Sequence, residues 1–212
     1  MQRSLVGSEM CIRDRYGSGG KTIGETLARD LGINCYDREL MRLASDESGI
    51  AEGLFGKADE KLKNSPLIRI TKNVYKGQLI PPESDEFTSN DNLFNYQAKV
   101  IRQLAEAESC VIIGRCADYV LKEYDHVISV FVHGSHDFCM KRAKERLGYG
   151  SDKDVEKYIA KTDKYRADYY HYYTGHEWFD ARNYDLCLDS SKLGFEKCVE
   201  EIKSYIAIRT KQ

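Results

Sequence analysis

The sequence lacks any long apolar run. No stretch approaches the ~20 continuous apolar residues that a membrane-spanning helix requires. It also lacks an excess of one charge, because 32 Lys and Arg stand against 34 Asp and Glu, giving a formal net charge of −2. A protein without a basic bias is not expected to bind nucleic acid through its overall charge. We therefore expect neither a membrane nor a nucleic-acid partner, and local motifs must identify the ligand.

The seven cysteines show no CxxC pair and no regular spacing. This arrangement fits neither a zinc site nor a disulfide framework. Cys110 and Cys187 lie inside short apolar runs, where a reduced cysteine behaves as a small buried hydrophobic residue. The cysteines therefore predict a cytoplasmic protein.

The overall composition is that of one compact globular domain. The chain has 212 residues, of which 42% are hydrophobic and 31% are charged. These values exclude a disordered or collagen-like chain, and the length leaves room for a small inserted subdomain.

The first fifteen residues differ from the rest of the chain. Residues 1–15 have neither the apolar centre of a signal peptide nor a helical periodicity. Residues 4–15 can be back-translated without a mismatch to a nucleotide sequence that resembles the transposon-end adapter of short-read sequencing libraries. The alternative is a genuine but unusual N-terminal segment. We interpret residues 1–15 as adapter-derived and 16–212 as the native domain.

A glycine-rich turn, Gly-Ser-Gly-Gly-Lys-Thr at 17–22, opens a helical pattern that ends at Gly32. Glycines let successive N–H groups point into one concavity, and the lysine and hydroxyl can reach phosphates and a magnesium ion. The full phosphate-loop pattern needs a further glycine at position 15, which is Arg15, so a flexible helix-capping turn is the alternative. We predict that the donor phosphates bind Gly17, Ser18, Gly19, Gly20, Lys21 and Thr22, with Thr22 as the metal ligand.

The remaining periodicity alternates strands with helices. Short apolar runs at 33–36, 110–113 and 127–132 predict buried strands, and residues 184–188 predict a further strand. Helical patterns begin at Asp37 and at about 93, 135 and 152, and a final helix reaches about 208. Residues 48–92 are rich in glycine and polar residues and are interpreted as an inserted, mobile lobe. This order predicts a parallel α/β fold with ligands beyond the carboxyl ends of the strands.

Four ordered blocks, at 17–24, 31–40, 111–118 and 188–191, resemble the cytidylate kinase-like family, a branch of the nucleoside monophosphate kinases. The resemblance implies a P-loop NTPase three-layer fold with a five-stranded parallel sheet. It also implies a monophosphate-binding insertion at 48–92, an arginine-bearing lid at 148–175, and a central first strand directly before the glycines. That native strand is expected to be missing. We predict that residues near 9–14 fill its place and that the chain is poorly stable as a result.

The resemblance also assigns roles to single residues. Arg115, after an apolar strand, can fork onto the acceptor phosphate, although a surface arginine is the alternative. Asp37 matches the aspartate that opens the monophosphate-binding helix, and an N-cap role is its alternative. Leu43 stands where cytidylate kinases have an arginine, and Arg38 and Arg42 are the candidates to replace it. Cys116 stands where those kinases have an aspartate. The predicted substrate-binding residues are Asp37, Arg42, Arg115 and Asp118.

Cations on the helix after the Gly148–Gly150 break are candidates for the lid. Lys161, Lys164 and Arg166 could neutralise the transferring phosphoryl group, with Arg142 and Arg146 as alternatives, or they could form an ordinary solvated face. Nearby aromatic residues from Tyr165 to Phe179 are interpreted as helix packing and a lid hinge rather than a nucleic-acid stacking surface.

The sequence thus predicts a magnesium-dependent kinase that moves the γ-phosphoryl group of ATP to CMP or dCMP. Its predicted catalytic residues are Lys21, Arg115 and Arg166. A nucleotide-binding regulator with little turnover is one alternative, because Cys116 and Leu43 replace charged groups. A kinase for another small acceptor is the second.

Overall fold

The computed structural model describes residues 9–56 and 77–210. Its strands are β1 (Met10–Asp14), β2 (Asn34–Tyr36), β3 (Cys110–Ile113), β4 (Ile128–His133) and β5 (Leu186–Asp189). Its principal helices are α1 (Gly20–Leu31), α2 (Glu39–Ser48), α4 (Asn90–Ala107), α5 (Ala117–Val120), α6 (His136–Leu147), α7 (Asp152–Thr174), α8 (Ser190–Leu193) and α9 (Phe195–Arg209). The predicted alternation of strands and helices is confirmed.

The five strands form one sheet in the order β2-β3-β1-β4-β5. Every neighbouring pair is parallel, as predicted. The order is not sequential, because helical crossovers carry the chain from β1 to β2 on one side and later to β4 on the other. In such sheets ligands bind beyond the carboxyl ends of the strands, at the point where the connections diverge.

The central position belongs to β1, which pairs with β3 and β4 at once. The prediction that residues near 9–14 fill this place is confirmed. Met10 and Ile12 are buried on one face of the sheet and Cys11 on the other. Glu9, just before the strand, is also fully buried. The origin of residues 1–15 in an adapter stays a prediction.

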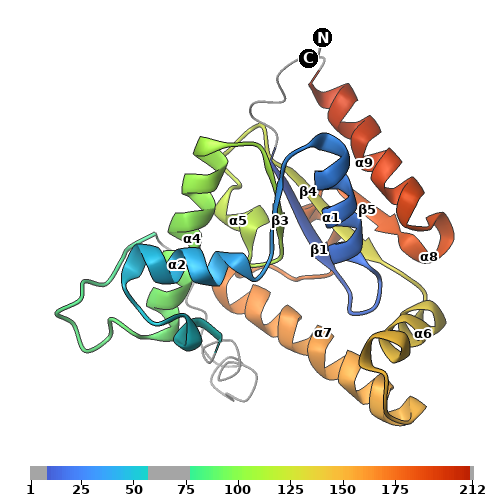
Figure 1. The fold of residues 1–212 in the computed structure, drawn as a ribbon, viewed down its shortest axis with the longest axis horizontal. Coiled ribbons are helices and arrows are strands. Elements are labelled where there is room, and N and C mark those ends of the chain that lie inside the picture. The colour runs from blue at the N-terminus through green and yellow to red at the C-terminus, as the bar shows by residue number, and fades with distance from the viewer. Residues whose placement is uncertain (1–8, 57–76, 211–212) are drawn as a thin grey trace.

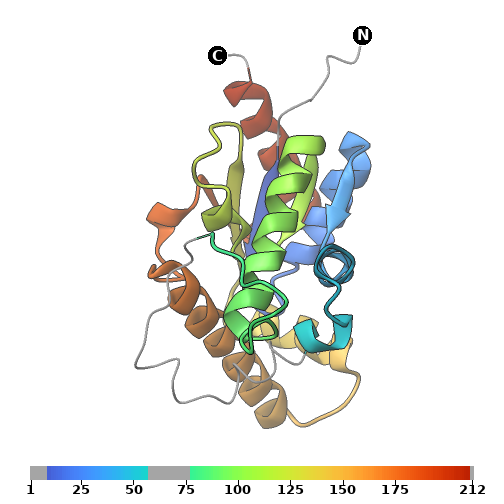
Figure 2. The same ribbon diagram turned by 90° about the vertical axis from the view of Figure 1, so that its left-hand side faces the viewer.

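Helices cover both faces of the sheet and make three layers. On one face lie α1 and α9 (Figure 1). Their side chains, such as Ile23, Leu27 and Ile202, are buried with residues of β1, β3 and β4. On the other face lie α4 and α5, and α7 passes across the end of the sheet (Figures 1 and 2). Apolar side chains of these three helices form one buried cluster with Ile112 and Phe131. The sheet is therefore closed to solvent on both sides, and its strand ends remain as the place for a ligand.

Two strands are more exposed than their sequences predict. β2 is a three-residue edge strand with Asn34 exposed, not a buried strand over 33–36. β5 is the opposite edge, and its Cys187 is exposed although its neighbours are apolar. An edge strand has only one paired side, so an apolar sequence alone does not ensure its burial.

The long helix α7 spans 23 residues and begins with a capping box in which Ser151 and Asp154 bond each other's backbone N–H groups. Its tyrosines pack against α4: Tyr173 stacks on Phe94 with ring centroids 3.9 Å apart. The interpretation of the aromatic stretch as helix packing is confirmed.

The predicted insertion at 48–92 lies partly outside the described residues. Among those that are described, no helix is long and apolar enough to cross a membrane.

Candidate active site

The glycine loop, residues 15–20, connects the central strand to α1. Gly17 and Gly19 both have φ of 88°, in the left-handed region that glycine adopts without strain. A Cβ on Gly17 would lie 2.5 Å from the Cys139 carbonyl oxygen, and one on Gly19 would lie 2.3 Å from the Phe195 ring. The conformation and the close packing therefore both require glycine at these two positions.

Ser18 fixes the loop from inside. Its hydroxyl lies 2.9 Å from the Arg15 carbonyl oxygen and 3.0 Å from that of Val132. The Ser190 hydroxyl in turn donates to the Ser18 carbonyl oxygen at 2.7 Å. Ser18 is fully buried, so its side chain shapes the loop and does not face the predicted phosphates.

A cavity of about 400 Å³, the loop cavity, lies against the glycine loop. Lys21 and Thr22, in the first turn of α1, contribute to its wall. So do three arginines from two other helices, Arg142, Arg146 and Arg166. Positive charge is thus gathered where the predicted donor phosphates would lie, and the alternative of a simple helix-capping turn loses support.

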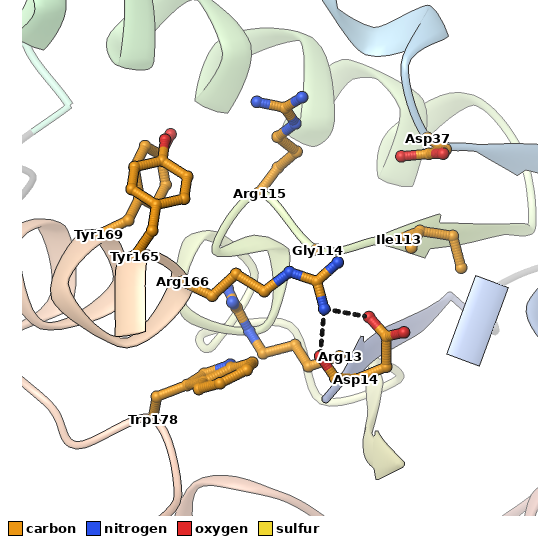
Figure 3. Close-up of a pocket in the computed structure, with 10 residues that line it drawn as sticks. All are labelled: Arg13, Asp14, Asp37, Ile113, Gly114, Arg115, Tyr165, Arg166, Tyr169 and Trp178. Carbon is orange, nitrogen blue, oxygen red and sulfur yellow. Dashed lines mark hydrogen bonds and ion pairs between the residues drawn. The ribbon is translucent and has the colours of Figure 1, made fainter. Parts of the chain in front are cut away.

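A second cavity of about 190 Å³, the strand-end cavity, opens beyond the carboxyl ends of β1 and β3 (Figure 3). Cationic, acidic and aromatic side chains surround it. Its lining residues are Arg13, Asp14, Asp37, Ile113, Gly114, Arg115, Tyr165, Arg166, Tyr169 and Trp178. Asp14 and Arg166 line both cavities, so the two spaces meet at this pair.

Arg166 from α7 reaches across to the end of the central strand. Its Nη1 donates to the Asp14 carbonyl oxygen at 2.6 Å and to Oδ1 of Asp14 at 3.1 Å (Figure 3). Burial raises the pKa of the Asp14 carboxyl, and the Arg166 charge opposes this rise. Of the three predicted lid cations, Arg166 lines both of these cavities, and Lys161 and Lys164 line neither.

Lys161 and Lys164 occupy the solvent-facing side of α7. Both are exposed, and the Lys164 ammonium pairs with Asp168 at 2.6 Å. Their positions favour the alternative of a solvated helix face. Arg142 and Arg146 line the loop cavity in their place.

Arg115 follows β3 in an unusual backbone turn. Gly114, Arg115 and Cys116 have φ of 74°, 56° and 54° in succession. The left-handed region costs roughly 1–2 kcal/mol for each residue that carries a Cβ, and such strain concentrates at functional sites. The turn brings Arg115 to the strand-end cavity, where it lies 3.7 Å from the Met41 sulfur. Cys116 is wholly buried beneath the turn, and burial raises its pKa to about 12.

Asp37 connects the strand-end cavity to α1. Its Oδ2 accepts a hydrogen bond from Lys21 Nζ at 2.8 Å, and this bond raises the pKa of Lys21. Asp37 does not cap α2, because Arg38 holds the N-cap position without a capping side-chain bond. The N-cap alternative is therefore wrong. A carboxylate and the loop lysine instead meet between the two cavities.

Arg42 points away from the site. It is exposed on α2 and pairs with Glu39 at 2.7 Å and Asp46 at 3.2 Å. It lines neither cavity. Its position does not favour the predicted substrate contact in this conformation.

Asp118 lies beneath the site, in the core. Its Oδ1 accepts from Arg13 Nε at 2.6 Å and its Oδ2 from the Tyr170 hydroxyl at 2.8 Å. The Arg13 guanidinium also lies over the Tyr170 ring, 4.3 Å from its centroid. Both carboxylate oxygens thus join β1 to α7, and the geometry does not favour the predicted contact with substrate.

Sequence reasoning missed several lining residues. Arg13 and Asp14 escaped because residues 1–15 were set aside as foreign. Tyr165, Tyr169 and Trp178 were interpreted as helix packing, but they also form a wall of the strand-end cavity. Since an aromatic residue on a helix carries no local signal for which neighbour it faces, only the tertiary arrangement identifies this wall.

The residues present fit a nucleoside triphosphate and magnesium. Backbone amides of the glycine loop, Lys21 and the three arginines would hold the phosphates, and the Thr22 hydroxyl would be an oxygen ligand for the metal. When bound, the magnesium ion neutralises phosphate charge.

The parallel sheet order, the glycine loop and the gathered cations define the class of P-loop kinases. A sequence model of the cytidylate kinase-like family matches residues 10–192, and the chain belongs to this family. No curated protein matches the sequence.

Among solved structures, the chain is similar to an uncharacterized protein from Eubacterium ventriosum, with 27% identity and a TM-score of 0.69, covering 94% of this chain and 98% of the other. It also resembles shikimate kinase from Bacteroides thetaiotaomicron, with 13% identity and a TM-score of 0.54, covering 94% and 98%. The second similarity shows the shared fold alone.

Proposed function

We propose that this protein transfers the γ-phosphoryl group of ATP to a nucleoside monophosphate, with CMP or dCMP as the acceptor. The observation that carries the proposal is the meeting of two cavities at Asp14 and Arg166. One cavity carries the glycine loop, and the other presents Arg115 and an aromatic wall suited to a base. The loop cavity suits the phosphate donor, the strand-end cavity suits the acceptor, and Arg166 lies where the phosphoryl group would pass between them.

Phosphoryl transfer needs positioning and charge neutralisation more than covalent chemistry. Lys21 would hold the terminal donor phosphates once they displace its contact with Asp37. Arg115 would grip the acceptor phosphate through its planar fork. Arg166, placed between the cavities, would neutralise the charge on the group in transit.

The acceptor follows from the family and from the chemistry of the strand-end cavity. An arginine and aromatic rings suit a phosphorylated compound with a flat base. Asp37 favours a second candidate, a kinase for a hydroxyl-bearing acceptor, because a carboxylate in this cavity can accept the proton of an attacking hydroxyl. A protein that binds nucleotide with little turnover and acts as a regulator is the third candidate.

We also propose a cytoplasmic location. Buried free cysteines such as Cys110 support it, because thiols stay reduced in the cytoplasm.

The test is ADP release from ATP and magnesium with a panel of nucleoside monophosphates and, separately, small hydroxylated acids and sugars. We expect CMP or dCMP to stimulate ADP release and Lys21→Ala to reduce it by at least roughly 100-fold. Stimulation by a hydroxylated compound alone would replace the nucleotide acceptor. Nucleotide binding without any transfer would support the regulator.

Lys203→Ala is the matched control. Lys203 is a partly exposed lysine on α9 that pairs with Asp30 at 3.1 Å and lines neither cavity. The control removes one positive charge and one surface ion pair without touching the site, so turnover should be unchanged.

A further inference from the structure

The helix that carries Arg166 is fastened to the glycine loop by a second residue, Asp163. This carboxylate lies three residues earlier on α7, and its side chain is only 8% exposed. Residues three apart on a helix share a face, so Asp163 and Arg166 both point to the segment that follows β1. Neither the family resemblance nor the proposed division of roles uses Asp163.

The Asp163 carboxylate contacts both the backbone and a side chain of the glycine loop. Its Oδ1 accepts from the Tyr16 N–H at 2.8 Å, and its Oδ2 lies 3.2 Å from Arg15 Nε. Arg166 bonds the Asp14 carbonyl oxygen and carboxylate. Two neighbouring side chains of α7 therefore hold three consecutive residues, from Asp14 to Tyr16.

The Tyr16 side chain strengthens the same junction. Its ring is buried in a small cluster between α6 and α7 with Ala143, Val155 and Ile159. It also meets Tyr158 edge to face, with centroids 5.1 Å apart. Rotation of α7 away from the loop would break this packing together with the Asp163 bond.

A buried carboxylate beside a phosphate-binding loop has an electrostatic cost, because it repels the anionic ligand. It also lies close along α7 to Arg166, which lines both cavities. We propose that Asp163 is a positioning residue that sets the place of Arg166 relative to the glycine loop. The inference rests on the kinase activity but not on the identity of the acceptor.

Loss of Asp163 should therefore lower the rate of phosphoryl transfer by displacing Arg166. A displacement of about 1 Å can cost up to roughly 100-fold in rate, so Asp163→Ala should lower kcat by roughly tenfold to 100-fold. The KM for ATP should stay within about twofold, because the loop glycines and Lys21 are untouched. Asp163→Asn should recover most of the rate, since its amide oxygen can still accept the Tyr16 N–H.

The decisive comparison is the double variant. If Asp163 acts through Arg166, then Asp163→Ala combined with Arg166→Ala should match Arg166→Ala alone within about twofold in kcat. Multiplied losses would overturn the proposal, because they would show independent roles. Asp168→Ala is the matched control, since Asp168 is a carboxylate on the same helix that pairs with the exposed Lys164 and lines neither cavity. An Asp163→Ala variant that behaves like this control would also overturn the proposal.

A binding measurement separates this inference from the proposed acceptor. Mg·ADP with aluminium fluoride mimics the phosphoryl group in transit, and Mg·ADP alone does not. Asp163→Ala should weaken the first by roughly tenfold and the second by less than about twofold. If no monophosphate supports transfer but this difference is found, the acceptor proposal fails and the positioning role stands. Equal weakening of both, or no binding of Mg·ADP to the unaltered chain, overturns the positioning role.

Discussion

Lys21 Nζ lies 2.8 Å from Asp37 Oδ2, so the lysine of the glycine loop is bonded to a carboxylate from the strand-end cavity. The lysine side chain is 41% exposed and that of Asp37 29%. A donor phosphate must compete with Asp37 for this lysine. Binding of a phosphate in the loop cavity therefore changes the hydrogen bonding of Asp37 in the strand-end cavity.

Asp37→Asn should weaken this competition. A partly exposed ion pair contributes at most about 1 kcal/mol, so the affinity for ATP should rise by no more than about fivefold. Turnover at low acceptor concentration should fall, because the cavity loses a carboxylate that can accept hydrogen bonds from the acceptor. Titration of ATP binding and the acceptor KM measure the two effects, and a weaker affinity for ATP would contradict the prediction.

Arg115→Ala should raise the acceptor KM. Loss of a charge-assisted, forked contact to a phosphate costs roughly 2–3 kcal/mol, or about 30- to 150-fold in affinity. Arg115→Lys should recover only part of this loss, because an ammonium cannot bind two phosphate oxygens in the same fork. Initial rates at varied acceptor concentration provide the measurement. Arg182→Ala, which removes an exposed arginine paired with Asp180, should leave the KM unchanged.

Glu9→Gln should stabilise the fold at neutral pH. Glu9 is fully buried, and burial raises the pKa of its carboxyl above the ordinary value of 4.5 although His126 lies 2.7 Å away and opposes the rise. The folded state thus binds the proton more tightly than the unfolded state, so stability is lost as the pH rises through the folded pKa. The amide avoids this loss, on the order of 1 kcal/mol or about 2–4 °C in Tm.

Thermal melts of Glu9→Gln and of the unaltered chain from pH 4 to pH 8 test whether the Glu9 charge destabilises the fold. The difference in Tm between Glu9→Gln and the unaltered chain should be small near pH 4 and grow as the pH rises. A difference that shrinks with rising pH would show that the Glu9 charge is stabilising in the folded state.

Replacement of residues 1–15 by a strand typical of the family should raise stability more than any single substitution. The central strand pairs on both sides and precedes the glycine loop, so a poor fit there affects the sheet and the site together. We expect a gain of several degrees in Tm and higher turnover. A cooperative melt of the unaltered chain at the same temperature as the repaired chain would count against the adapter interpretation.

The sequence by itself indicated the elements and the loop. Glycines at 17 and 19 can be identified from the text alone, because a left-handed φ restricts the choice of residue. The apolar run at 110–113 marks a strand buried on both faces, since the run has no polar alternation. The edge position of β2 and the exposure of Cys187 could not be derived in this way, because both depend on which strands lie at the ends of the sheet.

The site shows the same division. Lys21 and Arg115 follow from their place after a glycine loop and a strand, where local sequence and topology agree. The burial of Lys164, Arg42 and Asp118 depends on how their helices are rotated and docked against the rest of the fold. That docking depends on contacts between residues more than a hundred positions apart, such as the hydrogen bonds of Asp163 and Arg166 on α7 with residues 14–16. Only the tertiary structure therefore brings Arg166 between the two cavities and fastens its helix to the loop through Asp163.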